Sequence, residues 1–260
     1  MRRGGIAAAL GLVALAVFAA LPARAGTPSG VTEIAAAFAG PPAAGETRVL
    51  FIGNSFTREH DLPELVKGIA AREGVRLRPA MMVRDGAHLA QHAAAPEVAR
   101  LVADPGWEVL VLQDHSVAAL TPESAAASRA AAARLAGLTA ARLVLFATWP
   151  RAPGHALYAE PGMPDTPARM NARVAAHYAG LAEALGARVA GVGDAFLAVG
   201  ARASGPGLHA TDGYHASPEG ARLAASVLAA AILAPPLVPR AERAALSPAP
   251  AQPARSIAAR

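Results

Sequence analysis

The sequence of 260 residues contains no cysteine and few aromatic residues. The lack of cysteine excludes disulfide bonds, thiolate metal sites and a cysteine nucleophile. Aromatic residues make up 4% of the chain and charged residues 17%, whereas the hydrophobic fraction is 53%. This composition is typical of a globular protein whose core consists mostly of alanine, valine and leucine. The length allows one or two domains.

The excess of basic residues is confined to the two ends of the chain. The formal net charge is +5, but Arg2, Arg3 and Arg24 lie in a leader without acidic residues, and residues 234–260 are basic as well. Between these ends the charges nearly balance, at about −1. The sequence therefore predicts no basic groove and no nucleic-acid partner.

The first 25 residues have the pattern of an export signal. A cationic start is followed by an uncharged run from Ile6 to Leu21 and by the small-x-small sequence Ala23-Arg24-Ala25. We expect cleavage after Ala25, export to the periplasm or the medium, and no stable membrane association afterwards. An uncleaved anchor is the alternative, because the apolar run approaches the ~17 residues that span a bilayer.

Short β-type runs alternate with longer helical patterns over residues 47–233. The expected strands are Arg48 to Ile52, Arg76 to Val83, Glu108 to Leu112, Arg142 to Ala147 and Arg188 to Val192. The expected helices are Leu62 to Arg72, Leu89 to Ala103, Pro122 to Ala136, Pro167 to Leu185 and Pro218 to Leu233. This alternation predicts one three-layer α/β/α domain around a five-stranded parallel sheet.

Residues outside this alternation form connections and ends. Residues 26–46 are a lead-in, and the proline- and alanine-rich residues 234–260 are expected to form a flexible tail. The segment Trp149 to Thr166 is a long connection that could act as a lid or substrate wall. Two helix starts are legible: Asp61 with Glu64 as a capping box, and Ser217 before Pro218.

A candidate nucleophile follows the first predicted strand. In open parallel sheets, ligands bind outside the carboxyl ends of the strands. Here the strand runs into Gly53-Asn54-Ser55-Phe56-Thr57, where a glycine permits a sharp turn and leaves the Ser55 hydroxyl facing the crevice. The alternative is a polar turn that caps the next helix.

A candidate base and its carboxylate precede the last predicted helix. Asp212 and His215 are three residues apart in a glycine-bearing loop, so the carboxylate can hold one ring nitrogen while the other faces a serine. Such a base activates a serine hydroxyl for nucleophilic attack. A purely structural turn is the alternative for this pair. Asp194, after the fifth strand, is the rival orienting acid.

Acyl transfer also needs hydrogen-bond donors for the developing oxyanion. Gly86, after the second strand, can present its backbone N–H, and Gln113, after the third, can donate from its side-chain amide. The N–H of Ser55 would be the third donor. Alternatively, Gly86 only makes a turn and Gln113 ties down a loop.

Taken together, these blocks resemble the SGNH hydrolases, also called GDSL-like esterases and lipases, in their Gly-Asn-Ser-Phe-Thr subgroup. The resemblance implies a flavodoxin-like fold with Ser55 as nucleophile, His215 as base and Asp212 as orienting acid. It also implies an oxyanion hole made by Ser55, Gly86 and Gln113. Many members have Gly-x-Asn-Asp in the third block, where this chain has Leu112-Gln113-Asp114.

Other polar and aromatic residues near these blocks have less specific roles. Asn54, Asp114 and Trp149 are candidates for substrate binding. His88 and His92 are four apart on a predicted helix, as metal ligands would be, but the glutamate of a zinc hydrolase and a carboxylate cluster are missing. We therefore expect no metal and no cofactor.

The expected function is that of an exported serine esterase, with O-acetyl groups on carbohydrate as the first substrate class. A small-molecule or polysaccharide ester is thus the expected partner. A lipase or thioesterase acting on short acyl chains, a non-catalytic glycan- or peptide-binding protein and a phosphate-binding module remain alternatives. An imidazole base predicts activity that rises with pH in the range where histidine ordinarily titrates, near 6.5.

Overall fold

A computed structural model of the chain describes Ile34, residues 43–201 and residues 207–235. The predicted signal peptide, 1–25, lies outside the described residues, as do most of the lead-in, 26–46, and most of the tail, 234–260. Within the described part of the chain, no helix has the length and apolar character needed to cross a membrane.

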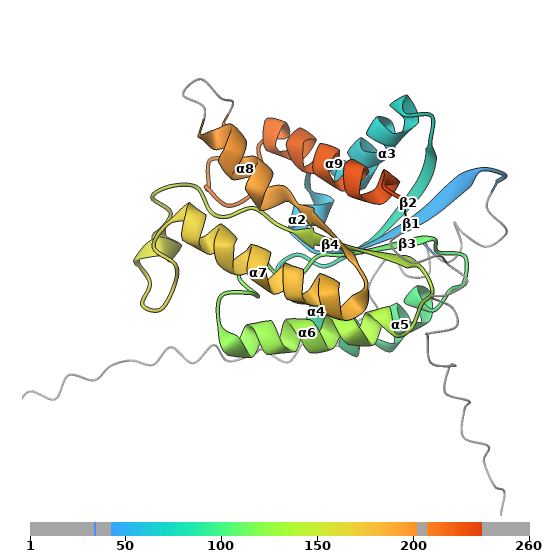
Figure 1. The fold of residues 1–260 in the computed structure, drawn as a ribbon, viewed down its shortest axis with the longest axis horizontal. Helices are drawn as coiled ribbons and strands as arrows, with labels where there is room; N and C mark the ends of the chain where they lie inside the picture. The colour runs from blue at the N-terminus through green and yellow to red at the C-terminus, as the bar shows by residue number, and fades with distance from the viewer. Residues whose placement is uncertain (1–33, 35–42, 202–206, 236–260) are drawn as a thin grey trace, which may run out of the picture.

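A five-stranded parallel sheet forms the centre of the molecule (Figure 1). Its strands are β1 (Glu46–Gly53), β2 (Arg76–Val83), β3 (Val109–Leu112), β4 (Arg142–Ala147) and β5 (Arg188–Gly191). Their order across the sheet is β2-β1-β3-β4-β5, and every neighbouring pair is parallel. Because β1 lies between β2 and β3, the loops after these three strands meet at one edge of the sheet.

Helices cover both faces of the sheet, as Figure 1 shows. One layer contains α3 (Leu62–Arg72), α8 (Val192–Gly200) and α9 (Pro218–Leu233). The other contains α4 (Leu89–Ala94), α5 (Pro96–Val102), α6 (Pro122–Ala136) and α7 (Pro167–Leu185). The short helices α2 (Ser55–Arg58), η1 (Glu59–Asp61) and η2 (Ala156–Ala159) lie in the connections. The predicted three-layer α/β/α class is therefore confirmed.

The two-residue repeat of the strands divides the core into two halves. Along β1, Val49 and Phe51 pack under the layer of α3, α8 and α9, whereas Leu50 and Ile52 pack under α4 to α7. All four side chains are buried. A continuous apolar run is what a parallel strand covered on both faces requires.

Several helix boundaries agree with the sequence because a proline at the first turn fixes them. The helices α6, α7 and α9 begin at Pro122, Pro167 and Pro218, each preceded by a serine or threonine whose side chain accepts a backbone N–H bond. The Ser217 cap predicted from the sequence is confirmed.

Three local expectations were wrong. The helix expected at Leu89 to Ala103 is divided into α4 and α5, because Ala95 before Pro96 is extended. Asp61 does not cap α3, since its backbone is left-handed and its side chain makes no cap hydrogen bond. The helix α8 was not predicted, and it begins at Val192, which the sequence placed in the fifth strand.

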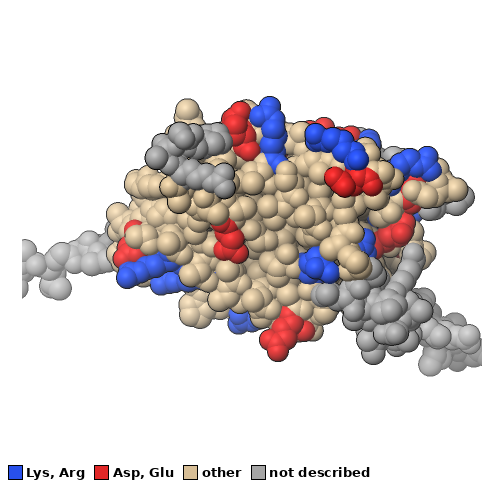
Figure 2. Space-filling model, turned by 45° about the horizontal axis from the view of Figure 1, so that its top comes forward, with Lys and Arg blue, Asp and Glu red and all other residues tan. Residues whose placement is uncertain are grey.

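Charged side chains are mixed over the face shown in Figure 2, where basic and acidic groups are interspersed. Several of them form exposed pairs, such as Lys67 with Glu64 at 2.9 Å and Arg169 with Asp165 at 2.5 Å. Exposed pairs of this kind contribute little to stability, about 0–1 kcal/mol each.

Candidate active site

The turn from β1 into α2 places Ser55 at the edge of the sheet. Ser55 is the first residue of α2, and Asn54 caps this helix by accepting the N–H of Phe56 at 3.1 Å. A Cβ on Gly53 would lie 2.3 Å from Gln113 Oε1 and 2.4 Å from Thr57 Oγ1. Glycine is therefore required because neighbouring side chains approach the backbone closely.

A buried polar network holds this turn against the loop after β3. Gln113 Oε1 accepts the N–H of Asn54 and the hydroxyl of Thr57, both at 2.9 Å. Its amide nitrogen donates to Asn54 Oδ1 at 3.0 Å and to the carbonyl of Asp114. Because a backbone N–H can only donate, these partners fix which end of the Gln113 amide is oxygen.

Gln113 is thus not placed to stabilise an oxyanion, contrary to the expectation from the sequence. Its side chain is 1% exposed, and its amide nitrogen is occupied by two acceptors of the protein itself. Its contacts instead fix Asn54 and Thr57 on either side of Ser55. Gln113 therefore holds in place the turn that carries Ser55.

The same turn is tied to the loops after β2 and to α4. Asn54 Nδ2 donates to the carbonyl of Ala87 at 3.0 Å, next to Gly86. His92 lies 2.8 Å from the Gly53 carbonyl, which can only accept, so Nε2 carries the proton. Burial lowers the pKa of His92 and keeps this ring neutral. The contact of His92 with Gly53 was not foreseen, because it joins residues 39 apart in sequence.

Ser55, His215 and Asp212 form a continuous hydrogen-bonded chain. Ser55 Oγ is 3.0 Å from His215 Nε2, and His215 Nδ1 is 2.7 Å from Asp212 Oδ2. A carboxylate only accepts, so Nδ1 carries the proton and Nε2 is left to accept that of the hydroxyl. The structure thus brings together three residues that the sequence places up to 160 positions apart.

Asp212 is held in its ionised form. Its second oxygen, Oδ1, accepts the backbone N–H groups of Tyr214 and His215 at 2.8 and 2.9 Å. Desolvation raises the pKa of Asp212, but the hydrogen bond from the His215 ring and the two backbone bonds outweigh it and lower this pKa to about 2. The rival acid Asp194 instead accepts from Asn171 Nδ2 at 2.6 Å.

Aromatic packing supports the loop that carries His215. The Trp149 ring is buried, stacks on Phe56 and Phe196, and donates from Nε1 to the Tyr214 carbonyl at 3.1 Å. The guanidinium of Arg151 lies 3.8 Å from the centre of the Tyr214 ring. Trp149 therefore packs under the loop, and its expected role in substrate binding is not met.

The other two candidates for substrate binding are also buried. Asn54 is engaged in the network around Ser55, and Asp114 is 3% exposed. Asp114 Oδ1 accepts the N–H of Leu89 at 2.7 Å and that of His115 at 2.6 Å. Both side chains therefore shape the loops around the site.

Gly86 and His115 lie in the loops on the two sides of Ser55. Gly86 has φ +67°, a conformation that favours glycine, and the loop is exposed there. The ring of His115 stacks on that of His88, which follows Gly86 by two residues, with centroids 4.7 Å apart. This stack connects the loop after β2 to the loop after β3.

His115 is a neutral donor at this edge. Burial, with the nearby His88 and Arg151, lowers the pKa of His115 to about 4. The N–H of Val117 points at Nδ1 from 3.4 Å, so the proton of the neutral ring lies on Nε2. In the sequence, only the position of His115 two residues after Gln113 indicates that its ring lies near the site.

The described residues contain no group of three or more histidine, aspartate or glutamate side chains that could hold a metal ion. His92 donates to a carbonyl and His88 stacks on His115, so this pair does not form a binding site.

Comparison with solved structures places this geometry in a family. A protein assigned to the SGNH hydrolases, from Slackia heliotrinireducens, is 31% identical over 72% of this chain and 99% of its own, with a TM-score of 0.57. The chain belongs to the SGNH hydrolases. Membership of this family supports an enzyme that hydrolyses esters.

More distant SGNH-like structures share the fold. TesA is 15% identical over 74% of this chain and 100% of its own, with a TM-score of 0.55. An acetyl xylan esterase from Geobacillus stearothermophilus is 16% identical over 72% and 93%, with a TM-score of 0.50. No family model and no curated protein matches the chain.

Proposed function

We propose that this SGNH hydrolase is an exported serine esterase with O-acetyl groups on carbohydrate as substrates. The observation that carries the mechanism is the chain from Ser55 Oγ through His215 to Asp212, with contacts of 3.0 and 2.7 Å. A non-catalytic binding protein would not need the hydrogen bond between Ser55 and His215.

The reaction follows from the proton positions. His215 Nε2 takes the proton of Ser55 Oγ as this oxygen attacks the ester carbonyl carbon. The protonated Nε2 then gives the proton to the alcohol oxygen as the C–O bond breaks. Water repeats the two steps on the acyl-enzyme and releases the acid. Asp212 keeps the ring oriented and stabilises the imidazolium.

The oxyanion needs donors other than Gln113. We assign the N–H groups of Ser55 and Gly86, on adjacent loops, and the Nε2–H of His115 as the side-chain donor. Three observations favour His115: it follows β3, the strand that pairs with β1, its neutral ring has the proton on Nε2, and its ring stacks on that of His88. A neutral ring donates a hydrogen bond to the oxyanion without itself carrying a charge, so the three donors stabilise the developing negative charge together.

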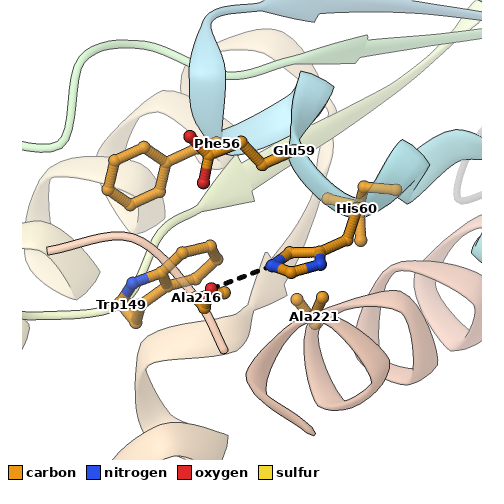
Figure 3. Close-up of a pocket in the computed structure, with 8 residues that line it drawn as sticks. Phe56, Glu59, His60, Trp149, Ala216 and Ala221 are labelled. Carbon is orange, nitrogen blue, oxygen red and sulfur yellow. Dashed lines mark hydrogen bonds between the residues drawn. The ribbon is translucent and has the colours of Figure 1, made fainter. Parts of the chain in front are cut away.

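A small hollow beside α2 is lined by neither Ser55 nor His215, and it therefore does not set the acyl length. The hollow between Phe56, Trp149 and Ala216 has a volume of about 10 Å³, which is room for about one water molecule. Figure 3 shows these side chains around it. The choice of acetyl groups and of carbohydrate as the alcohol half rests on the family and on the export signal that the sequence predicts for residues 1–25.

Turnover of p-nitrophenyl acetate by the wild type, Ser55→Ala and His215→Ala tests the mechanism, together with labelling by a fluorophosphonate. We expect wild-type turnover, a label on Ser55, and a loss of at least about 10³-fold in kcat for each variant. Absence of both turnover and label in the wild type would overturn the proposal in favour of a binding protein.

A further inference from the structure

A second carboxylate faces the proposed base from the side of the nucleophile. Glu59 Oε1 lies 3.5 Å from His215 Nε2, the nitrogen that also contacts Ser55 Oγ at 3.0 Å. Among the described residues, the His215 ring is the one basic side chain whose nitrogen lies within 4 Å of the Glu59 carboxylate. The side chain of Glu59 is 30% exposed, so it borders the open side of the site.

The backbone after Glu59 is held in an unusual conformation. His60 and Asp61 are consecutive non-glycine residues with φ values of 57° and 51°. Such residues are uncommon and persist only where the surroundings enforce them. Here His60 Nε2 donates to the carbonyl of Ala216, next to His215, at 3.0 Å. Figure 3 shows the His60 ring directed at Ala216, whereas Glu59 extends on the side of Phe56.

The interaction between Glu59 and His215 changes when the proton of Ser55 moves to Nε2. Before the attack, Nε2 is unprotonated, and two acceptors 3.5 Å apart do not attract each other. Once the Ser55 proton has moved to Nε2, the carboxylate faces an imidazolium. The attraction arises only as this charge develops, and interactions of this kind accelerate a reaction.

Glu59 also lies where the alcohol half of an ester must pass. The leaving oxygen has to come within about 2.6–3.2 Å of Nε2 to receive the proton. A polar oxygen three bonds from that oxygen, on the next carbon of the alcohol half, then comes near the Glu59 carboxylate. A hydroxyl there can donate a charge-assisted hydrogen bond, whereas an anionic group is repelled.

We propose that Glu59 is a specificity-determining residue that selects esters whose alcohol half carries a hydroxyl on the carbon beside the ester-bearing carbon, and that it rejects anionic alcohols. A vicinal hydroxyl is a general property of partly acetylated sugars. The inference rests on the proposed esterase function and names the chemistry of its leaving group.

Three acetate esters of similar size test it: 2-hydroxyethyl acetate, propyl acetate and the acetoxyacetate anion. For the wild type we expect kcat/KM for the hydroxyethyl ester to be about three- to tenfold above that for propyl acetate. For acetoxyacetate we expect a value about tenfold below that for propyl acetate. Acetylcholine is a fourth substrate, and a larger gain for it than for the hydroxyethyl ester would overturn the hydroxyl assignment in favour of cation selection.

Two variants separate charge from hydrogen bonding. Glu59→Gln keeps an acceptor oxygen, so we expect it to lose the discrimination against acetoxyacetate and to keep part of the hydroxyl preference. Glu59→Ala should lose both. Glu73→Gln removes one negative charge from the exposed end of α3 and should leave all ratios unchanged. If Glu59→Ala does not fold, the Glu59→Gln ratios decide.

Failure of this inference is distinguishable from failure of the proposed function. The wild type could hydrolyse p-nitrophenyl acetate and propyl acetate while both Glu59 substitutions leave the ratios of kcat/KM between the esters unchanged. This result would overturn the role of Glu59 and leave the proposed serine esterase intact. Wild type without turnover and without a fluorophosphonate label on Ser55 overturns both.

Discussion

The two halves of the candidate site are built in contrasting ways. The nucleophile half, Gly53 to Thr57, is buried and fixed by side-chain hydrogen bonds to residues from distant parts of the chain, such as Gln113 and His92. The base half, Asp212 to His215, is more exposed, and the Asp212 carboxylate that orients its ring is bound within the loop itself, although Trp149 supports the loop from below. A change in the first half should therefore affect folding and activity together, whereas a change in the second should affect activity alone.

The largest effect on activity without loss of stability is expected from Asp212→Asn. The backbone N–H groups of Tyr214 and His215 both need an oxygen at the Oδ1 position, so the new amide nitrogen must face His215 Nδ1. His215 would then carry its proton on Nε2 and could not accept that of Ser55. We expect a fall of about 10⁴-fold in kcat. The kinetics of p-nitrophenyl acetate hydrolysis and a melting curve test this.

Asp212→Glu serves as the comparison for this variant, because it keeps the charge and changes only the reach of the side chain. If Asp212→Asn melts far below the wild type, the base half also contributes to stability, and the contrast between the two halves is wrong.

Replacement of His115 comes next in size. His115→Ala removes the proposed side-chain donor, and loss of one such donor costs about 10²–10³-fold in kcat. His115→Gln retains an N–H donor and should recover part of the rate. Val117→Ala nearby is a control for local packing. Equal kcat values for the wild type and His115→Ala would exclude the ring from the oxyanion hole.

Gln113→Leu tests the nucleophile half, where we expect stability and activity to fall together. The substitution leaves the buried N–H of Asn54 and the Thr57 hydroxyl without their acceptor, and each unsatisfied buried group costs about 1–3 kcal/mol. We expect a lower free energy of unfolding, by about 2–4 kcal/mol, and reduced turnover. Urea denaturation measures the first quantity.

Gln91→Ala is the matched control, because Gln91 is exposed and its side chain accepts a single N–H, that of His88, at 2.9 Å. Its loss should cost less than about 1 kcal/mol. A Gln113→Leu variant as stable as this control would mean that the buried network contributes little.

The smallest effect expected is on stability at mildly acidic pH. Burial lowers the pKa of four histidines, His92, His115, His177 and His209, that of His115 to about 4. The unfolded chain, with ordinary values near 6.5, binds these protons more readily, so the free energy of unfolding falls as pH drops below about 6.5. The low pKa of Asp212 acts in a separate window, below about pH 4.

Melting temperatures at pH 7 and pH 5 in buffers of equal ionic strength test this dependence, and we expect the lower value at pH 5. His92→Gln, which retains a donor for the Gly53 carbonyl, should reduce the difference. A melting temperature that rises on acidification would show that buried histidines do not control this range.

The sequence predicted the elements that proline and capping residues mark, and it predicted which three side chains form the hydrogen-bonded chain at the candidate site. Pro167 and Pro218 begin helices where expected, and Asp212 holds His215 within one loop, which local spacing is able to indicate. In contrast, the orientation of the Gln113 amide depends on Asn54 and Thr57, which are more than 50 residues away in sequence. Sequence spacing carries no information on such a contact.

The position of Glu59 was missed for a related reason. No pattern in the sequence indicates that His60 and Asp61 adopt left-handed backbone conformations, since glycine is the usual residue there. The same conformation explains why the expected Asp61 cap does not form. In contrast, the proline at position 96 does indicate the division between α4 and α5. The prediction of a single helix gave more weight to the helical periodicity of the segment than to this proline.

The separation of 160 residues between Ser55 and His215 also bears on the order of events during biosynthesis. A chain that emerges from its N-terminal end presents the serine early, and the imidazole follows only after most of the domain has been made. A nascent or truncated chain that ends before α9 lacks the base, or the helix that anchors its loop. Hydrolytic activity would thus arise in one late step, and partly synthesised chains would be inactive.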